Sequence, residues 1–143
     1  MSLFQDLTSK DPKRIWSACG AIKDLHESHQ LNELANSIEL IKSATAGVNL
    51  GGALCPNSYH LEFALKKLEY TRQNQGCLCV LYPDNMFFDP AKETEKGHVT
   101  VLDTITIENK WVDYYVCECK ICHSKFKVEE REGHFVWWTW KRA

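Results

Sequence analysis

Apolar and polar positions in the first half of the chain follow the three-to-four-residue spacing of amphipathic helices. A helix is predicted to begin at Asp11 and Pro12, because aspartate caps free amides and proline suits the first helical position. Its apolar stripe comprises Ile15, Ala18, Cys19, Ile22 and Leu25. Cys19 lies on this stripe and is therefore interpreted as a small buried hydrophobe.

Two further helices are predicted before residue 76. The second has an apolar stripe of Leu31, Leu34, Ala35, Ile38 and Ile41. Gly47 is expected to end this helix as a left-handed cap residue. The third is expected to begin at Asn57 or Ser58, and its apolar face comprises Leu61, Ala64, Leu65 and Leu68.

After residue 76 the spacing changes to the alternation that is typical of strands. Short strands are predicted over 77–82 and 86–88, and the polar segment 89–97 is predicted to be a surface loop. A meander is then predicted from strands over 99–107, 111–119, 126–128 and 135–140. Asp103 falls on the apolar side of its strand, so a bulge or hairpin is expected near it.

These elements predict an α+β fold. Antiparallel N-terminal helices are expected to pack on a C-terminal antiparallel β-sheet that carries a zinc-ribbon-like cysteine site. The 143 residues are expected to form a single domain, with a helical half at 1–75 and a zinc-binding sheet half at 76–143.

Composition and charge narrow the class of protein. Hydrophobic residues make up 44% of the chain and charged residues 25%, which is ordinary for a soluble domain. No apolar run approaches the ~20 residues of a membrane span, and the N-terminus lacks a signal-peptide pattern, so we expect a cytoplasmic protein. The net charge of −2 argues against general nucleic-acid binding, which normally uses a basic face.

The seven cysteines point to metal binding rather than to disulfides, because the count is odd and five of them fall in two tight clusters. Cys119 and Cys122 have the spacing of a metal-binding knuckle. Cys77 and Cys79 are expected to lie on one face of a strand. These four residues are the predicted ligands of one zinc ion, and a closed set of four would make the site structural rather than catalytic.

Other uses of these cysteines stay open. Cys117 lies on the same strand face as Cys119 and is the chief substitute ligand, and His123 and His98 are weaker substitutes. Cys119 and Cys122 could instead form a redox pair, although such a pair usually opens a helix and here strands are predicted on both sides. The thiols could also be buried without a metal.

Aromatic residues crowd into the last third of the chain, namely Trp111, Tyr114, Tyr115, Phe135, Trp137, Trp138 and Trp140. Most are expected to form the core of the sheet, since aromatic residues favour strands. An exposed part of the group, with Trp137, Trp138 and Trp140 as candidates, would anchor a protein partner. Base stacking is the third interpretation, but the interleaved Lys and Arg that it needs are sparse.

The acidic residues near the end of the chain have two interpretations. Glu129 and Glu130, with Glu132, are either a solvated face or an acidic spot that meets a basic partner. No phosphate-binding glycine loop or hydrolase motif occurs, and neither His60 nor His134 has a catalytic constellation around it in the sequence. We therefore expect no enzyme activity.

The overall layout resembles the small immunity proteins of bacterial toxin systems, including contact-dependent growth inhibition and other polymorphic toxin systems. The likeness is carried by the helix start at residues 11–16, the Cys117-x-Cys119-x-x-Cys122 segment and the Gly133–Trp138 segment that follows it. The resemblance implies a cytoplasmic, non-enzymatic protein, here expected to be a monomer, that binds and neutralises a cognate toxin domain.

Two further hypotheses stand beside immunity. The chain could be a zinc-stabilised adaptor or regulatory binding protein of another kind, including one that contacts nucleic acid. It could also be an enzyme, which would require an open metal position or a polar cleft. Salt-sensitive binding to DNA or RNA would favour the adaptor.

Overall fold

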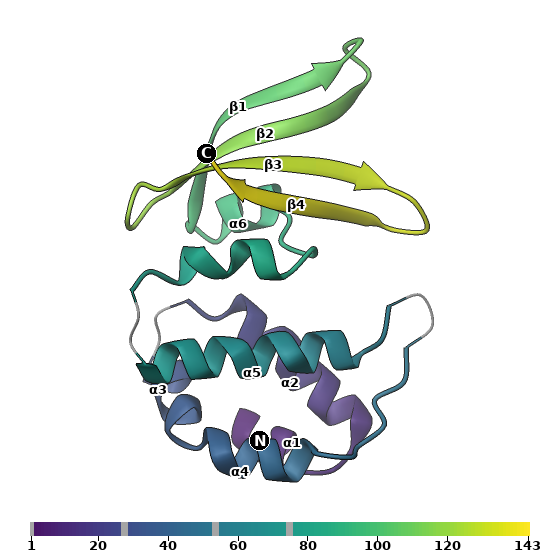
Figure 1. Ribbon diagram of the computed structural model, residues 1–143, viewed down its shortest axis with the longest axis vertical. Coiled ribbons are helices and arrows are strands. Elements are labelled where there is room, and N and C mark those ends of the chain that lie inside the picture. Colours follow the sequence, from purple (N-terminus) through teal and green to yellow (C-terminus); the bar gives the residue numbers. More distant parts are fainter. Residues whose placement is uncertain (1, 27–28, 53–54, 74–75) are drawn as a thin grey trace. The chain divides into compact units, whose positions relative to one another are not determined.

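The computed structural model describes residues 2–26, 29–52, 55–73 and 76–143. The chain divides into two compact units, Met1–Leu78 and Cys79–Ala143, and each is described by itself. The first unit is helical, and the second is built on a four-stranded antiparallel sheet (Figure 1). The α+β class predicted from the sequence is therefore confirmed.

The described residues of the first unit form five helices, namely α1 (Leu3–Leu7), α2 (Pro12–Asp24), α3 (His29–Asn36), α4 (Ile38–Thr45) and α5 (Ser58–Gln73). The predicted start of α2 is confirmed, because the Asp11 side chain accepts a hydrogen bond from the Lys13 amide and Pro12 is the first helical residue. α2 and α3 both pack against α5. α1 was not predicted, although Ser2 and Gln5 form a reciprocal capping box at its start.

The second predicted helix is in fact two helices, which meet at Ser37. The Ser37 amide bonds to the Leu34 carbonyl with the tighter three-residue spacing, and the Ser37 carbonyl accepts from the Ile41 amide. Ser37 thus ends α3 and starts α4, a position that serine favours over a helix interior. The apolar stripe continues across the break, since Leu31, Leu34, Ile38 and Ile41 are all buried. Gly47 has a positive φ of 76° just after α4, as the sequence predicted.

A buried lysine joins two helices of the first unit. Lys67 on α5 is buried, and its Nζ donates hydrogen bonds to the backbone carbonyls of Lys23 and Leu25. These carbonyls lie at the C-terminal end of α2, where the helix dipole favours a positive charge. Burial of this ammonium group is therefore matched by acceptors that the end of α2 would otherwise leave unpaired.

The second unit begins with a helical layer where the sequence predicted strands and a loop. Residues Leu78–Asp84 form the 3₁₀ helix η1, and no strand forms over 86–88. Leu78, Leu81 and Tyr82 are buried whereas Val80 is exposed, which is a helical rather than an alternating pattern. Pro83 also lies within this segment, and proline is a poor residue for a paired strand.

The segment predicted to be a polar surface loop contains helix α6 (Pro90–Glu95). Asp89 caps its start by accepting a hydrogen bond from the Ala91 amide, and Pro90 is its first residue. The pair repeats the Asp11-Pro12 signal that correctly predicted α2. The signal for α6 was therefore present in the sequence, but the polar composition of the segment hid it.

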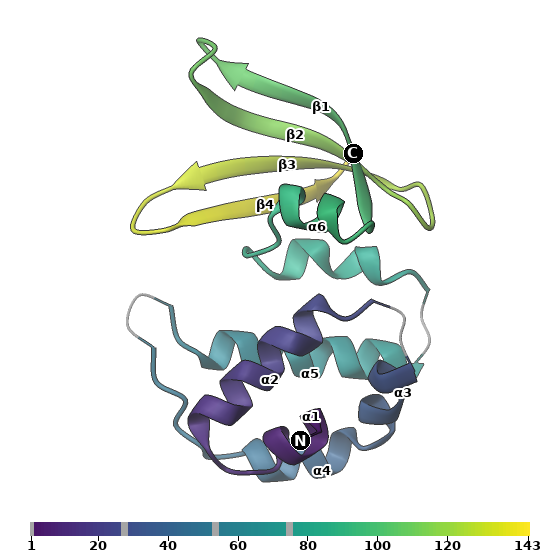
Figure 2. The ribbon, with the colours of Figure 1, turned by 180° about the vertical axis from the view of Figure 1, so that it is seen from behind.

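The sheet is a meander of β1 (Val99–Ile107), β2 (Trp111–Cys119), β3 (Lys125–Glu132) and β4 (Val136–Arg142), in that order across the sheet (Figure 2). The expected irregularity near Asp103 is confirmed, because the β1–β2 register shifts between Val101 and Asp103. None of the described helices is both long enough and apolar enough to cross a membrane.

One face of the sheet packs against η1 and the segment before α6. Its buried side chains are Val99, Cys117, Cys119, Phe126, Val128 and Trp140. The ring of Tyr82 from η1 stacks on Trp140 with a centroid distance of 4.1 Å, and Trp140 Nε1 donates to the Phe88 carbonyl at 2.9 Å. This aromatic core positions the cysteine end of the sheet.

The buried face of α4 can be tested with a matched pair of substitutions. Ile38 is fully buried, so Ile38→Asp places an unpaired charge in the core and should lower the free energy of unfolding by about 3 kcal/mol or more. Leu40, two residues away and 64% exposed, should tolerate the same change to Asp within about 0.5 kcal/mol. Thermal and urea unfolding followed by circular dichroism measure both. Equal losses in the two variants would mean that the buried face of α4 is assigned incorrectly.

Candidate metal centre

Four cysteine side chains converge in the described structure. The Sγ atoms of Cys77, Cys79, Cys119 and Cys122 all lie within 4.8 Å of one another. Cys79 Sγ and Cys122 Sγ are 3.4 Å apart, and none of the seven cysteines forms a disulfide. This cluster can hold a metal ion, and it contains the same four residues that the sequence predicted as ligands.

The turn between β2 and β3 brings Cys119 and Cys122 together. The His123 amide donates to the Cys119 carbonyl at 2.9 Å, and the Cys119 amide donates to the Ser124 carbonyl at 2.9 Å. His123 adopts a left-handed φ of 63°, a conformation in which histidine is one of the more frequent residues other than glycine. The tight reversal places both thiols on the same side of the turn, as expected for a cysteine knuckle.

The other two thiols are positioned by a helical turn rather than by a strand. Cys79 lies in η1 and Cys77 directly precedes it, so the expected strand geometry is wrong while the expected convergence is observed. Gly76 has a positive φ of 122°, which glycine adopts without strain, and it redirects the chain into this segment. The Cys77 carbonyl accepts a hydrogen bond from the Tyr70 hydroxyl at 3.1 Å, which fixes the backbone beside the thiol.

The three substitute ligands considered from the sequence do not join the cluster. Cys117 is buried on the same face of β2 as Cys119, and this burial raises the pKa of its thiol to about 12. His98 Nδ1 lies 3.1 Å from a Glu93 carboxylate oxygen, and His123 Nδ1 lies 3.5 Å from Glu118. Cys117 therefore behaves as a neutral core residue, while the two histidines face carboxylates.

Cys122, the exposed member of the cluster, is linked to a basic residue through a serine hydroxyl. Cys122 Sγ lies 3.1 Å from Ser124 Oγ, which accepts a hydrogen bond from Arg142 Nη2 at 2.8 Å. Ser124 thus connects the Arg142 guanidinium to the Cys122 thiol.

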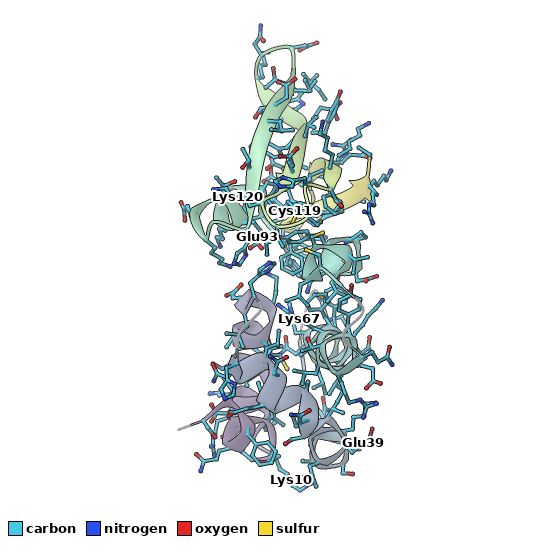
Figure 3. The ribbon with its side chains drawn as sticks, turned by 90° about the vertical axis from the view of Figure 1, so that its left-hand side faces the viewer. Lys10, Glu39, Lys67, Glu93, Cys119 and Lys120 are labelled. Carbon is cyan, nitrogen blue, oxygen red and sulfur yellow. The ribbon has the colours of Figure 1, made fainter. Side chains whose placement is uncertain are left out.

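A buried carboxylate in the same unit was missed by sequence reasoning. Glu93 on α6 is only 3% exposed, and it accepts hydrogen bonds from Tyr82 Oη at 2.8 Å and Lys96 Nζ at 3.3 Å. Burial acts to raise the pKa of Glu93, but the hydrogen bonds from His98 and Tyr82 outweigh it and lower the pKa overall. Figure 3 labels Glu93 and Cys119, and Tyr82 connects this carboxylate to the aromatic core beside the cysteines.

The residues proposed as partner-binding from the sequence fall into different environments. Trp140 is only 2% exposed and belongs to the core, so it offers no surface to a partner. Trp138 is half-buried, and its Nε1 donates to Glu130 at 3.0 Å, where the Tyr115 hydroxyl also donates at 3.1 Å. Trp137 is half-buried on the opposite face.

Two more residues of the sheet, Glu129 and Trp111, bear on partner binding. Glu129 pairs with Lys141 and Arg131, each at 2.9 Å, and the hydrogen bond from Lys141 lowers the pKa of its carboxyl. Trp111 was grouped in the sequence with the aromatic residues expected to form most of the core. It is 56% exposed and is therefore more exposed than Trp137 or Trp138. Trp111 is the first residue of β2 and follows a turn, and this position could have predicted its exposure from the sequence.

Comparisons with known proteins give no independent identification. No family model, curated protein or solved structure matches this chain. The assignment of function therefore depends on the chemistry of the cysteine cluster and of the exposed parts of the sheet.

The cluster generates a direct test with an internal control. Protein purified without chelator should contain about one metal ion per chain, and Cys119→Ser or Cys122→Ser should lose most of it, because a four-thiolate site binds weakly with one ligand missing. Cys117→Ser, on the same face of the same strand, should keep the full metal content. Elemental analysis measures all three variants. Metal-free wild-type protein would contradict the assignment.

Proposed function

We propose that the cysteine cluster binds one Zn²⁺ ion. The observation that carries this proposal is the mutual distance of the four sulfur atoms, all within 4.8 Å. Four thiolates around zinc at a Zn–S distance of about 2.3 Å lie roughly 3.8 Å from one another, which this arrangement can reach with small shifts. Soft thiolate ligands also select zinc over the hard cations magnesium and calcium.

Zinc bound by all four cysteines has a structural role in this proposal. Four protein ligands complete a tetrahedral site and leave no position for a substrate. The ion would join the segment that contains Cys77 and Cys79, at the boundary between the two units, to the β2–β3 turn at Cys119 and Cys122. Structural zinc sites of this kind contribute on the order of 10 kcal/mol to folding.

The proposed biological role is binding of a protein partner, with a toxin domain as the partner that the sequence resemblance implies. Support comes from the sheet, where Trp111 and Trp137 present aromatic surface and Glu129 and Glu130 supply acceptors. Tryptophan is among the residue types that contribute most to binding at protein interfaces. Neutralisation would follow from covering the active site of the toxin or from blocking access to its substrate.

A zinc-stabilised adaptor that contacts nucleic acid is the second candidate. The net charge of −2 disfavours it, because affinity for DNA or RNA depends on neutralising phosphates. The salt dependence of binding separates the two candidates. Affinity for a protein toxin should fall only modestly between low and physiological salt, whereas affinity for nucleic acid should fall steeply.

Identification of the metal is tested by removing and restoring it. Wild-type protein treated with a zinc-selective chelator should lose the folded sheet unit, seen as a loss of near-ultraviolet aromatic signal and of the cooperative thermal transition. Added Zn²⁺ should restore both signals, while added Mg²⁺ should restore neither. Retention of the full aromatic signal in metal-free protein would show that the site does not support the fold.

Partner binding is tested in cells and with purified proteins. Bacteria that express the wild-type chain should survive the toxin encoded by the neighbouring gene, and the two proteins should form a stoichiometric complex. Trp137→Ala should weaken this complex by about 2 kcal/mol without unfolding the protein. Trp140→Ala should instead reduce stability by about 3 kcal/mol or more, because Trp140 is buried. An absence of both protection and complex formation with the wild type would exclude the immunity role for that toxin.

A further inference from the structure

The four-stranded sheet divides into two hairpins at the end away from the cysteines. Pairing between β2 and β3 runs from Glu118 and Lys125 to Tyr114 and Glu129, and goes no further in the described chain. Beyond that point Trp111 and Val112 pair only with β1, and residues 130–132 pair only with β4. Figures 1 and 2 show the β1–β2 and β3–β4 hairpins diverging from this fork.

A cleft of about 420 Å³ lies between the two hairpins. Ile107, Trp111 and Val112 form its apolar wall on the first hairpin, and Val136 faces them from the second. Ile107, Trp111 and Val136 are all among the exposed large hydrophobic residues of the chain. The cleft therefore gathers exposed apolar surface into one concave site, which is where binding sites tend to occur.

Arg131 lines the cleft and links the two hairpins where the pairing of β2 with β3 has stopped. Its Nη1 donates to the Asp113 carbonyl at 2.8 Å and to the Glu130 carbonyl at 2.7 Å. Its Nη2 pairs with the carboxylates of Asp113 at 3.0 Å and Glu129 at 2.9 Å. One guanidinium thus bridges both hairpins, and the two carbonyls that it reaches show that backbone acceptors of both strands face the fork.

The charge that remains in the cleft is negative. Asp113 and Glu129 both form ion pairs with Arg131, so its positive charge is neutralised by these two carboxylates. Among the described residues, Glu130 receives hydrogen bonds only from the neutral donors Tyr115 Oη and Trp138 Nε1, which orient the carboxylate without adding a positive charge. Glu132 is exposed, and no ion pair to it is found in the described part of the chain. An apolar cleft with two uncompensated carboxylates complements a basic, apolar ligand.

We propose that this cleft binds an extended segment of the protein partner in which lysine or arginine flanks a large apolar side chain. The proposal rests on the proposed partner-binding function and specifies the chemistry of the bound segment. The apolar side chain lies between Trp111 and Val136, and the flanking cations meet Glu130 and Glu132. An extended segment suits the fork because its backbone can pair with the strand edges that diverge there.

The test uses two labelled synthetic peptides and the full-length, metal-loaded protein. One peptide alternates isoleucine with lysine, and its matched control alternates isoleucine with glutamate. Fluorescence polarisation should show binding of the lysine peptide and at least about tenfold weaker binding of the glutamate peptide. Equal affinity for both peptides, or no binding of either, overturns the proposal.

Two pairs of variants locate the binding. Trp111→Ala and Glu132→Lys should each weaken binding of the lysine peptide by at least about tenfold. Trp16→Ala removes another exposed tryptophan, and Glu95→Lys makes the same charge change on α6, and both should bind like the wild type. Melting temperatures check that all four variants are folded. Unchanged binding by folded Trp111→Ala overturns the assignment of the site.

The same variants distinguish a different occupant of the cleft, and a failure of the proposed function, from a failure of the cleft proposal. A wild-type dimer in sedimentation that Trp111→Ala converts to monomers would assign the cleft to a second copy of the chain and overturn the proposal. If Trp111→Ala protects cells from the toxin as well as the wild type does, the cleft inference fails while the immunity function stands. If the peptide results hold but the wild type gives no protection, the cleft inference stands and the toxin is not the partner.

Discussion

In the proposed function, the close approach of four cysteine thiols is the constraint on which the second unit depends. Two of them, Cys79 and Cys119, are buried, and four thiolates at this spacing repel one another unless a cation lies among them. A metal ion among them would remove this repulsion and would join the start of the unit to the β2–β3 turn. The aromatic stack of Tyr82 on Trp140 and the buried Glu93 pack in the same unit as three of these cysteines.

The two ends of the sheet are organised differently, and the difference suits a binding protein. Near the cysteines β2 and β3 are paired, and the face of the sheet is covered by η1. At the other end the pairing stops and Arg131 bridges the hairpins, which leaves apolar surface exposed at Trp111. Sites that bind with precision need support from rigid elements, and the cysteine end of the sheet can supply that support to the open end.

Much of the secondary structure could be predicted because its signals are local. The Asp11-Pro12 cap, the helical stripes and the strand meander are written in residues close together in the chain. The errors also have local causes. Ser37 divides a continuous apolar stripe into two helices, and an apolar segment ending in Pro83 forms a 3₁₀ helix because its buried positions do not alternate. A polar composition hid α6, although Asp89 and Pro90 marked its start.

The sequence by itself determined the fold class and the four residues of the cysteine cluster, because their paired spacing is a local property that survives the wrong prediction of a strand at Cys77. Only the tertiary structure decided that Cys117 stays in the core, that Trp140 is buried while Trp111 is exposed, and that the sheet forks beyond Tyr114. These outcomes depend on which residues distant in the chain come to lie opposite one another. Alternation along a strand shows that two faces exist, but only packing decides which face is covered and how far the pairing extends.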